Sequence, residues 1–78
     1  MHKCRFMDIK AGLLFRRADG RLCRKMASGF YHVNEDLDEV GDCLSLSPHA
    51  EVKLLLEENG LVEMKDQYGN TVVVRRVL

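Results

Sequence analysis

The seven residues RRADGRL, Arg16 to Leu22, give the clearest local indication of how this chain folds. Asp19-Gly20 stands between two runs of strand-forming residues, 13–17 and 22–26. Glycine accepts a positive φ without a Cβ clash, so a DG pair between two such runs is typical of a tight β-hairpin turn. The sequence therefore predicts two antiparallel strands joined at Gly20.

Similar turn signals recur along the chain at Ser28-Gly29, Asn59-Gly60 and Gly69-Asn70. Between the turns, apolar and polar residues mostly alternate with a period of two, which is typical of half-buried strands. The strands predicted from this pattern are 13–17, 21–26, 30–33, 43–46, 51–57, 61–65 and 71–77.

A chain of 78 residues is expected to form a single domain, residues 1–78, because it is too short to bury two cores. The fold class expected is all-β: a small bent sheet or barrel of five to seven short antiparallel strands. The expected core consists of Leu13, Phe15, Leu22, Leu44, Leu46, Val52, Leu54, Leu56, Val62, Met64, Val72 and Val74. Leu55 and Val73 are apolar residues on the opposite strand faces, so each needs a second cover, from a partner or another copy.

Residues 48–59 also allow a helical interpretation. Ser47 is a good N-cap, Pro48 suits the first helical position, and Gly60 follows the end. A helix would spread its apolar side chains around most of its circumference, whereas a strand would misplace only Leu55. We favour the strand; the alternative is an α+β fold with one helix near 48–59 followed by a C-terminal hairpin.

The three cysteines, Cys4, Cys23 and Cys43, are predicted to be free thiols. Their number is odd, and no C-x-x-C pair or closely spaced histidine pair is present. A zinc site made from them and one histidine would lack the usual ligand spacing. We expect no metal and no cofactor.

The longest apolar runs, residues 54–56 and 72–74, are far shorter than the roughly 20 residues of a membrane-spanning helix. Charges interrupt the amino-terminal ten residues, which therefore lack the apolar stretch of a secretory signal. These features predict a cytoplasmic protein without membrane contact.

Charge is unevenly distributed in a chain whose formal net charge is zero. Residues 1–33 hold eight lysines and arginines against two acids, and residues 34–66 hold ten acids against two lysines. The two segments either neutralise each other through cross-strand pairs or present separate charged surfaces to partners.

The segment NEDLDEVGD, Asn34 to Asp42, concentrates five of the acids. As a calcium loop it fails in both registers. A register starting at Asp36 places Val40 at a ligand position and Ser47 where a glutamate is required, and one starting at Asn34 places Glu39 where glycine is required. A pair of catalytic carboxylates would need a cleft that a domain of this size has little volume to form. We therefore expect a protein without enzymatic activity.

A resemblance rests on two stretches, DIKAGLLFRRADGRLCRKMASGFYHV and VGDCLSLSPHAEVKLL, which lie within residues 8 to 56. Their glycine-phenylalanine strand, DG hairpin and later proline-containing turn resemble small uncharacterised β-rich proteins of phages and mobile elements. The resemblance implies a small intracellular accessory protein and transfers no catalytic residue.

The leading functional prediction is a protein-binding module, in which a carboxylate patch complements a larger protein with a basic surface. Together with the resemblance, this suggests an inhibitor of a host protein such as a defence complex. The predicted partner-binding residues are Glu35, Asp36, Asp38, Glu39, Asp42 and Tyr31. The protein itself is expected to be a monomer or a weak homodimer.

The alternative prediction is a nucleic-acid-binding β-barrel that uses the basic hairpin. Its candidate residues are Arg16, Arg17, Arg21, Arg24 and Lys25. Basic side chains would follow the phosphates, and Tyr31 would stack on a base.

Overall fold

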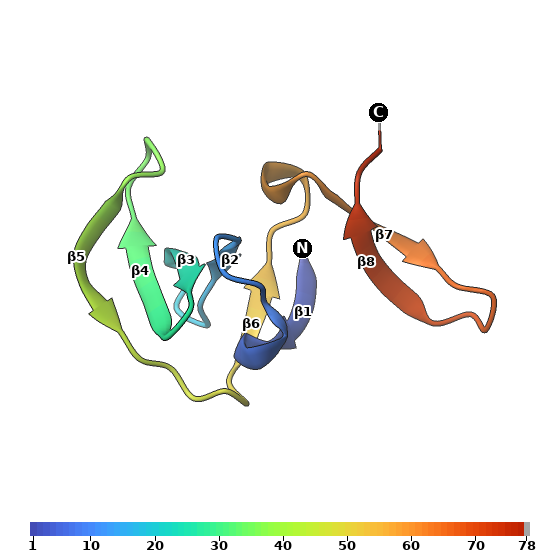
Figure 1. Ribbon diagram of the computed structural model, residues 1–78, viewed down its shortest axis with the longest axis horizontal. Helices are drawn as coiled ribbons and strands as arrows, with labels where there is room; N and C mark the ends of the chain where they lie inside the picture. The colour runs from blue at the N-terminus through green and yellow to red at the C-terminus, as the bar shows by residue number, and fades with distance from the viewer. Residues whose placement is uncertain (78) are drawn as a thin grey trace.

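The computed structural model describes residues 1–77. Within these residues the chain forms eight strands and two 3₁₀ turns (Figure 1). In chain order these are β1 (His2–Arg5), η1 (Phe6–Asp8), β2 (Leu14–Arg16), β3 (Leu22–Met26), β4 (Gly29–Val33), β5 (Glu39–Leu44), β6 (Glu51–Leu54), η2 (Glu57–Asn59), β7 (Leu61–Lys65) and β8 (Thr71–Arg75).

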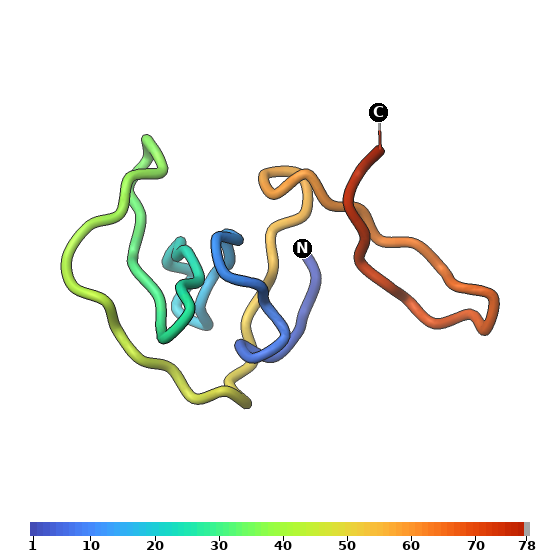
Figure 2. The backbone as a smooth tube through the Cα atoms, in the orientation of Figure 1, coloured from blue at the N-terminus to red at the C-terminus, as the bar shows by residue number. Residues whose placement is uncertain are grey.

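Six strands form one antiparallel sheet in the order β1-β6-β2-β3-β4-β5, and β7 pairs with β8 in a separate hairpin. The sheet is bent, and the hairpin lies beyond its β1 end (Figures 1 and 2). No ladder joins β1 to β5 among residues 1–77, so the sheet does not close into a barrel. The all-β prediction is confirmed, in the form of an open bent sheet. No helix in this part of the chain has the length and apolarity to cross a membrane.

The DG hairpin is confirmed. Arg16 pairs with Leu22 across the turn, and Gly20 has a φ of 84°. The Asp19 carboxylate accepts a hydrogen bond from the backbone N–H of Arg21 at 3.0 Å, which stabilises the turn locally.

The helical alternative for residues 48–59 is wrong, because this segment forms strand β6 and the short turn η2. β6 lies between β1 and β2 and pairs with both. The backbone hydrogen bonds of two neighbouring strands therefore outweigh the favourable helix cap at Ser47 and Pro48. Leu55, the residue that the strand interpretation misplaced, is buried directly after the strand.

Two strands differ from the prediction. β1 was not predicted from the sequence, and the strand predicted at 43–46 is β5, at Glu39–Leu44, in the structure. All six β5 residues are exposed at the sheet edge, so no apolar alternation marks this strand. β1 is four residues long and alternates half-buried with charged positions, which is a weak signal in so short a segment.

The core is aromatic at its centre. Phe6, Phe15 and Phe30 meet edge to face, with ring centroids 5.5 to 6.1 Å apart. The buried apolar residues are Phe6, Ile9, Leu14, Phe15, Cys23, Phe30, Val52, Leu54 and Leu55. The prediction was correct for Phe15, Val52 and Leu54.

The core prediction was wrong for the C-terminal hairpin and for Leu44, which is exposed. Leu61 and Val73 of the hairpin pack against the core. Strand alternation then directs the predicted core residues Met64 and Val74 to the other side, and both are exposed.

Candidate nucleic-acid interface

Strand alternation gives the six-stranded sheet one face toward the phenylalanine core and one face away from it, here called the outer face. Phe15 of β2 and Leu54 of β6 point into the core, so their neighbours Arg16 and Lys53 lie on the outer face. Lys3 of β1 belongs to the same face, because it pairs directly with Lys53.

Three cations stand side by side on this outer face. Lys3 is the register partner of Lys53, and Lys53 is also the register partner of Arg16. These three residues, from three adjacent strands, are called the basic row. Like charges directly opposite each other destabilise a sheet, so the basic row lowers the stability of the fold. A bound anion would reduce this repulsion, which makes the row a candidate anion-binding surface.

Nearby carboxylates neutralise the basic row only in part. The Lys3 ammonium lies 3.7 Å from the Glu51 carboxylate, but both side chains are about 70% exposed, at 73% and 69%, so this pair is weak. The Arg16 guanidinium donates to the backbone oxygen of Gly20 at 2.9 Å. No ion pair to Arg16 or Lys53 occurs among residues 1–77.

The basic row borders a hollow of about 320 Å³, which is also lined by Arg17, Ala18, Glu51 and Val52. Lysine and arginine donors around an open hollow suit phosphate oxygens, which accept several charge-assisted hydrogen bonds.

Tyr31 and Arg24 extend the outer face toward β4, where they are direct register partners and both half-buried. The Arg24 guanidinium lies 3.8 Å from the Glu39 carboxylate. Arg24 is therefore partly neutralised, whereas Tyr31 supplies an aromatic side chain on the face that carries the basic row.

The structure separates the five basic residues that the sequence analysis grouped. Arg16 and Arg24 lie on the outer face, and Arg21 is exposed beside the β2–β3 turn. The Arg17 guanidinium lies 5.2 Å from the centroid of the Phe30 ring.

Lys25 lies on the core side of the sheet. Its ammonium donates to the backbone oxygen of Phe6 at 2.6 Å and lies 3.8 Å from the centroid of the Phe6 ring. Burial lowers the pKa of Lys25. The structure therefore separates Lys25 from the basic row.

The predicted acidic residues lie at the opposite edge of the sheet. Glu35, Asp36 and Asp38 are in the β4–β5 connection, and Glu39 and Asp42 belong to β5. Asn34 Oδ1 stabilises this connection, because it accepts hydrogen bonds from the backbone N–H groups of Asp36 and Asp38 at 2.9 and 3.0 Å. Tyr31, predicted with this group, lies on the outer face.

No three potential metal ligands converge anywhere in the described chain, from Met1 to Val77. Cys23 and His32 do approach each other, with 3.7 Å between Sγ and Nδ1. Burial raises the pKa of Cys23 to about 11. Burial also lowers the pKa of His32, and the positive charges of Arg21 and Arg17 lower it further. This pair therefore lacks the activated thiolate of a cysteine nucleophile.

Lys3 and Lys53 were not predicted as site residues from the sequence. Lys3 belongs to β1, which was not predicted. Lys53 was interpreted only as one of the polar, solvent-facing positions that alternate with apolar ones along β6. Only the sheet order, which inserts β6 between β1 and β2, brings these lysines beside Arg16. No short-range pattern in the sequence encodes that neighbourhood.

Comparison with known proteins gave no match to any family model, curated protein or solved structure.

Proposed function

We propose that this protein binds single-stranded nucleic acid through the outer face of its six-stranded sheet. The observation that carries the proposal is the in-register placement of Lys3, Lys53 and Arg16. Phosphates bound along this row would relieve the repulsion that the fold otherwise retains. Tyr31 on the same face offers a ring on which a base can stack.

The size of the basic row sets the expected salt dependence. Three cations that each neutralise one phosphate give a slope of about −2 for the logarithm of the binding constant against the logarithm of salt concentration. Fluorescence anisotropy with a labelled single-stranded oligonucleotide measures this slope. We expect a dissociation constant on the order of 10 µM at low salt.

Replacing Lys53 by Gln tests the central cation of the row. Loss of one phosphate contact should reduce the salt slope by about 0.7 and weaken binding several-fold for every sequence tested. The same substitution removes a like charge from between Lys3 and Arg16, so the free energy of unfolding should rise by about 0.2 to 1 kcal/mol.

Lys65→Gln is the matched control, because Lys65 is an exposed lysine on the separate β7–β8 hairpin. This variant should bind like the original protein. If Lys53→Gln and Lys65→Gln reduce binding equally, the interaction is a general charge effect and the assignment to the basic row is wrong.

A protein-binding role is the second candidate, and a separate observation favours it. β5 is an edge strand with every residue exposed, and its apolar Val40 and Leu44 lie among carboxylates. Such an edge suits a larger protein with a basic surface, as an inhibitor of a host protein would require. Joint replacement of Asp36, Asp38 and Glu39 by their amides should abolish capture of such a protein and leave oligonucleotide binding intact.

A further inference from the structure

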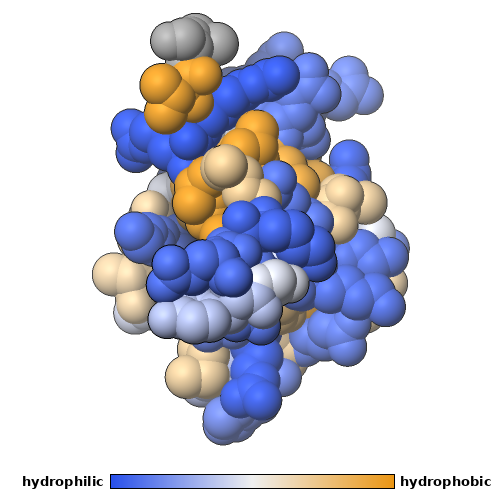
Figure 3. Space-filling view, turned by 90° about the vertical axis from the view of Figure 1, so that its right-hand side faces the viewer, coloured by the Kyte–Doolittle hydropathy of each residue, from blue (hydrophilic) through white to orange (hydrophobic). Residues whose placement is uncertain are grey.

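The β7–β8 hairpin carries four apolar side chains on the face turned away from the core. Val62 pairs with Val74, and Met64 pairs with Val72, so all four share one face. Met64 is 53% exposed and Val74 36%. These four residues are called the apolar quartet. Figure 3 shows an orange patch of hydrophobic surface on the side of the molecule where the hairpin lies.

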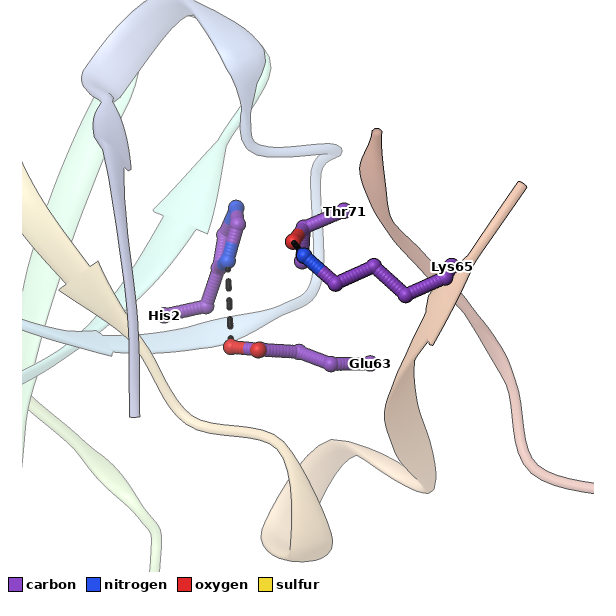
Figure 4. Close-up of polar contacts among 4 residues, drawn as sticks. All are labelled: His2, Glu63, Lys65 and Thr71. Atoms are coloured by element: carbon purple, nitrogen blue, oxygen red, sulfur yellow. Dashed lines mark hydrogen bonds and ion pairs between the residues drawn. The ribbon is translucent and has the colours of Figure 1, made fainter. Parts of the chain in front are cut away.

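Contacts on the opposite face fix the orientation of the hairpin. Leu61 and Val73 pack against the core, and the Glu63 carboxylate accepts a hydrogen bond from His2 Nδ1 at 3.2 Å (Figure 4). With this face held, the apolar quartet cannot turn inward. A two-stranded hairpin has little stability by itself, and an apolar face of this kind is typical of an interaction surface.

Two opposite charges flank the apolar quartet. The backbone hydrogen bonds between the two strands continue at both ends of the hairpin. Asp66 N–H donates to the backbone oxygen of Asn70 at 2.9 Å, and Arg76 N–H donates to the backbone oxygen of Gly60 at 2.7 Å. Strand alternation therefore places Asp66 on the quartet's face near the hairpin turn and Arg76 on the same face at the base. Asp66 Oδ1 accepts hydrogen bonds from the backbone N–H groups of Tyr68 and Asn70 at 2.9 Å each, so the second carboxylate oxygen is the one that would face Arg76 of another copy. Neither residue forms an ion pair within the described residues.

We propose that this face binds the same face of a second copy of the chain, with the two hairpins antiparallel about a two-fold axis. The turn of one hairpin then lies over the base of the other, and the two apolar quartets cover each other. Arg76 of each copy faces Asp66 of the other, which forms two opposite-charge contacts. A parallel arrangement would instead place Arg76 against Arg76, so charge selects the antiparallel one.

The surface is small for a dimer interface. Four apolar side chains and two charges on each copy are far fewer than the roughly 20 to 30 residues a side of a standard interface. The dimer is accordingly weak, with a dissociation constant on the order of 0.1 mM. The proposal is independent of the nucleic-acid interface, since it uses only the separate hairpin.

Sedimentation equilibrium over about 10 µM to 1 mM protein tests the proposal, a range that spans the expected dissociation constant. The average mass should rise from 8.9 kDa toward twice that value. Arg76→Glu should raise the dissociation constant about tenfold, because it replaces two attractive contacts by repulsive ones. Arg75→Glu makes the same charge change on the opposite face and should leave the dissociation constant unchanged.

Met64→Lys places a charge within the quartet and should abolish the dimer, while its NMR spectrum at low concentration remains that of the folded monomer. A protein that stays at 8.9 kDa throughout contradicts the proposal. Equal effects of Arg75→Glu and Arg76→Glu also contradict it. So does concentration-dependent protection of the Thr71, Val73 and Arg75 amides from hydrogen exchange, which would indicate pairing through the β8 edge instead.

Discussion

Cys23 and Cys43 show how position decides the chemistry of a single residue type. Cys23 is fully buried beside Phe15, with which it pairs in register, whereas Cys43 is exposed on the edge strand. The thiolate is the reactive form, and burial holds the Cys23 pKa at about 11. At pH 8 a thiol reagent should therefore modify Cys43 rapidly and Cys23 only as fast as the protein unfolds.

The raised pKa of Cys23 also predicts a loss of stability at high pH. The thiol ionises near 9.0 in the unfolded chain and near 11 in the fold, so between these values the unfolded state loses the proton first. The free energy of unfolding should fall by about 2 kcal/mol across this interval. Urea unfolding of the original protein and a Cys23→Val variant measures the difference; an identical pH dependence in both would contradict the assignment.

Asn59 joins the turn η2 to strand β2 through its side chain. Its amide oxygen accepts Leu14 N–H at 2.9 Å, and its amide nitrogen donates to the backbone oxygens of Leu14 and Leu55 at 2.8 and 2.7 Å. The side chain thus satisfies the Leu14 N–H and the Leu55 oxygen, and it adds a second, shorter hydrogen bond to the Leu14 oxygen, which also accepts from Leu55 N–H at 3.4 Å. Its sequence position suggested only a turn before Gly60.

Asn59→Ala removes the side-chain partner of the Leu14 N–H and of the Leu55 oxygen, and it leaves the Leu14 oxygen only the longer bond from Leu55 N–H. The substitution should lower the free energy of unfolding by about 2 to 3 kcal/mol. Gln67→Ala, at an exposed position in the β7–β8 turn, is the control and should change it by less than about 0.5 kcal/mol. Chemical denaturation measures both. A small effect of Asn59→Ala would mean that water replaces the side chain at no cost.

At the scale of the elements, Gly29 at the start of β4 allows β4 and β5 to approach closely. A Cβ at this position would clash with the backbone oxygen of Leu44 and would lie 3.1 Å from the sulfur of Cys43. The first contact is with backbone, so the strands themselves must move to accommodate a methyl group.

Gly29→Ala should therefore separate the edge strand β5 from the sheet and cost about 1 to 3 kcal/mol of stability. Gly20→Ala is the comparison: its Cβ meets no atom within 4 Å, so its cost comes only from the positive φ of 84°. Amide exchange should accelerate in β5 for Gly29→Ala alone. If amide hydrogen exchange in β5 is unchanged in Gly29→Ala, the inference that Gly29 allows the close approach of β4 and β5 is contradicted.

The sequence predicted the elements whose signals are local. The turn at Asp19-Gly20 and the alternation around Lys53 identified the β2–β3 hairpin and β6 correctly. The pairing of β6 with β1 and β2 depends on contacts between segments about 40 to 50 residues apart, which no turn or period encodes. The basic row exists only through that pairing. Arg16 and Tyr31 of the candidate site were therefore predicted from the sequence, whereas Lys3 and Lys53 were not.

Across the whole molecule, the uneven charge of the sequence becomes a separation in space. The basic row lies on β1, β6 and β2, at one end of the strand order, and the acidic segment lies on β5 and the connection before it, at the other end. Within residues 1–77, one ion pair joins a lysine or arginine of the basic segment to a carboxylate of that acidic edge, and it is formed by Arg24 and Glu39. The two charged segments therefore remain largely available to partners of opposite sign.

This separation predicts where nucleic acid binds and where it is repelled. Phosphates should gather at the basic row and avoid β5, so the footprint covers about half of the outer face. The protein should consequently bind oligonucleotides although its formal net charge is zero.

An NMR titration of the isotope-labelled protein with a short single-stranded oligonucleotide tests the central claim most directly. The account predicts progressive chemical-shift changes at Lys3, Arg16 and Lys53, with Tyr31 following and β5 unaffected. No changes at low salt, or changes concentrated on β5 or the β7–β8 hairpin, would contradict it.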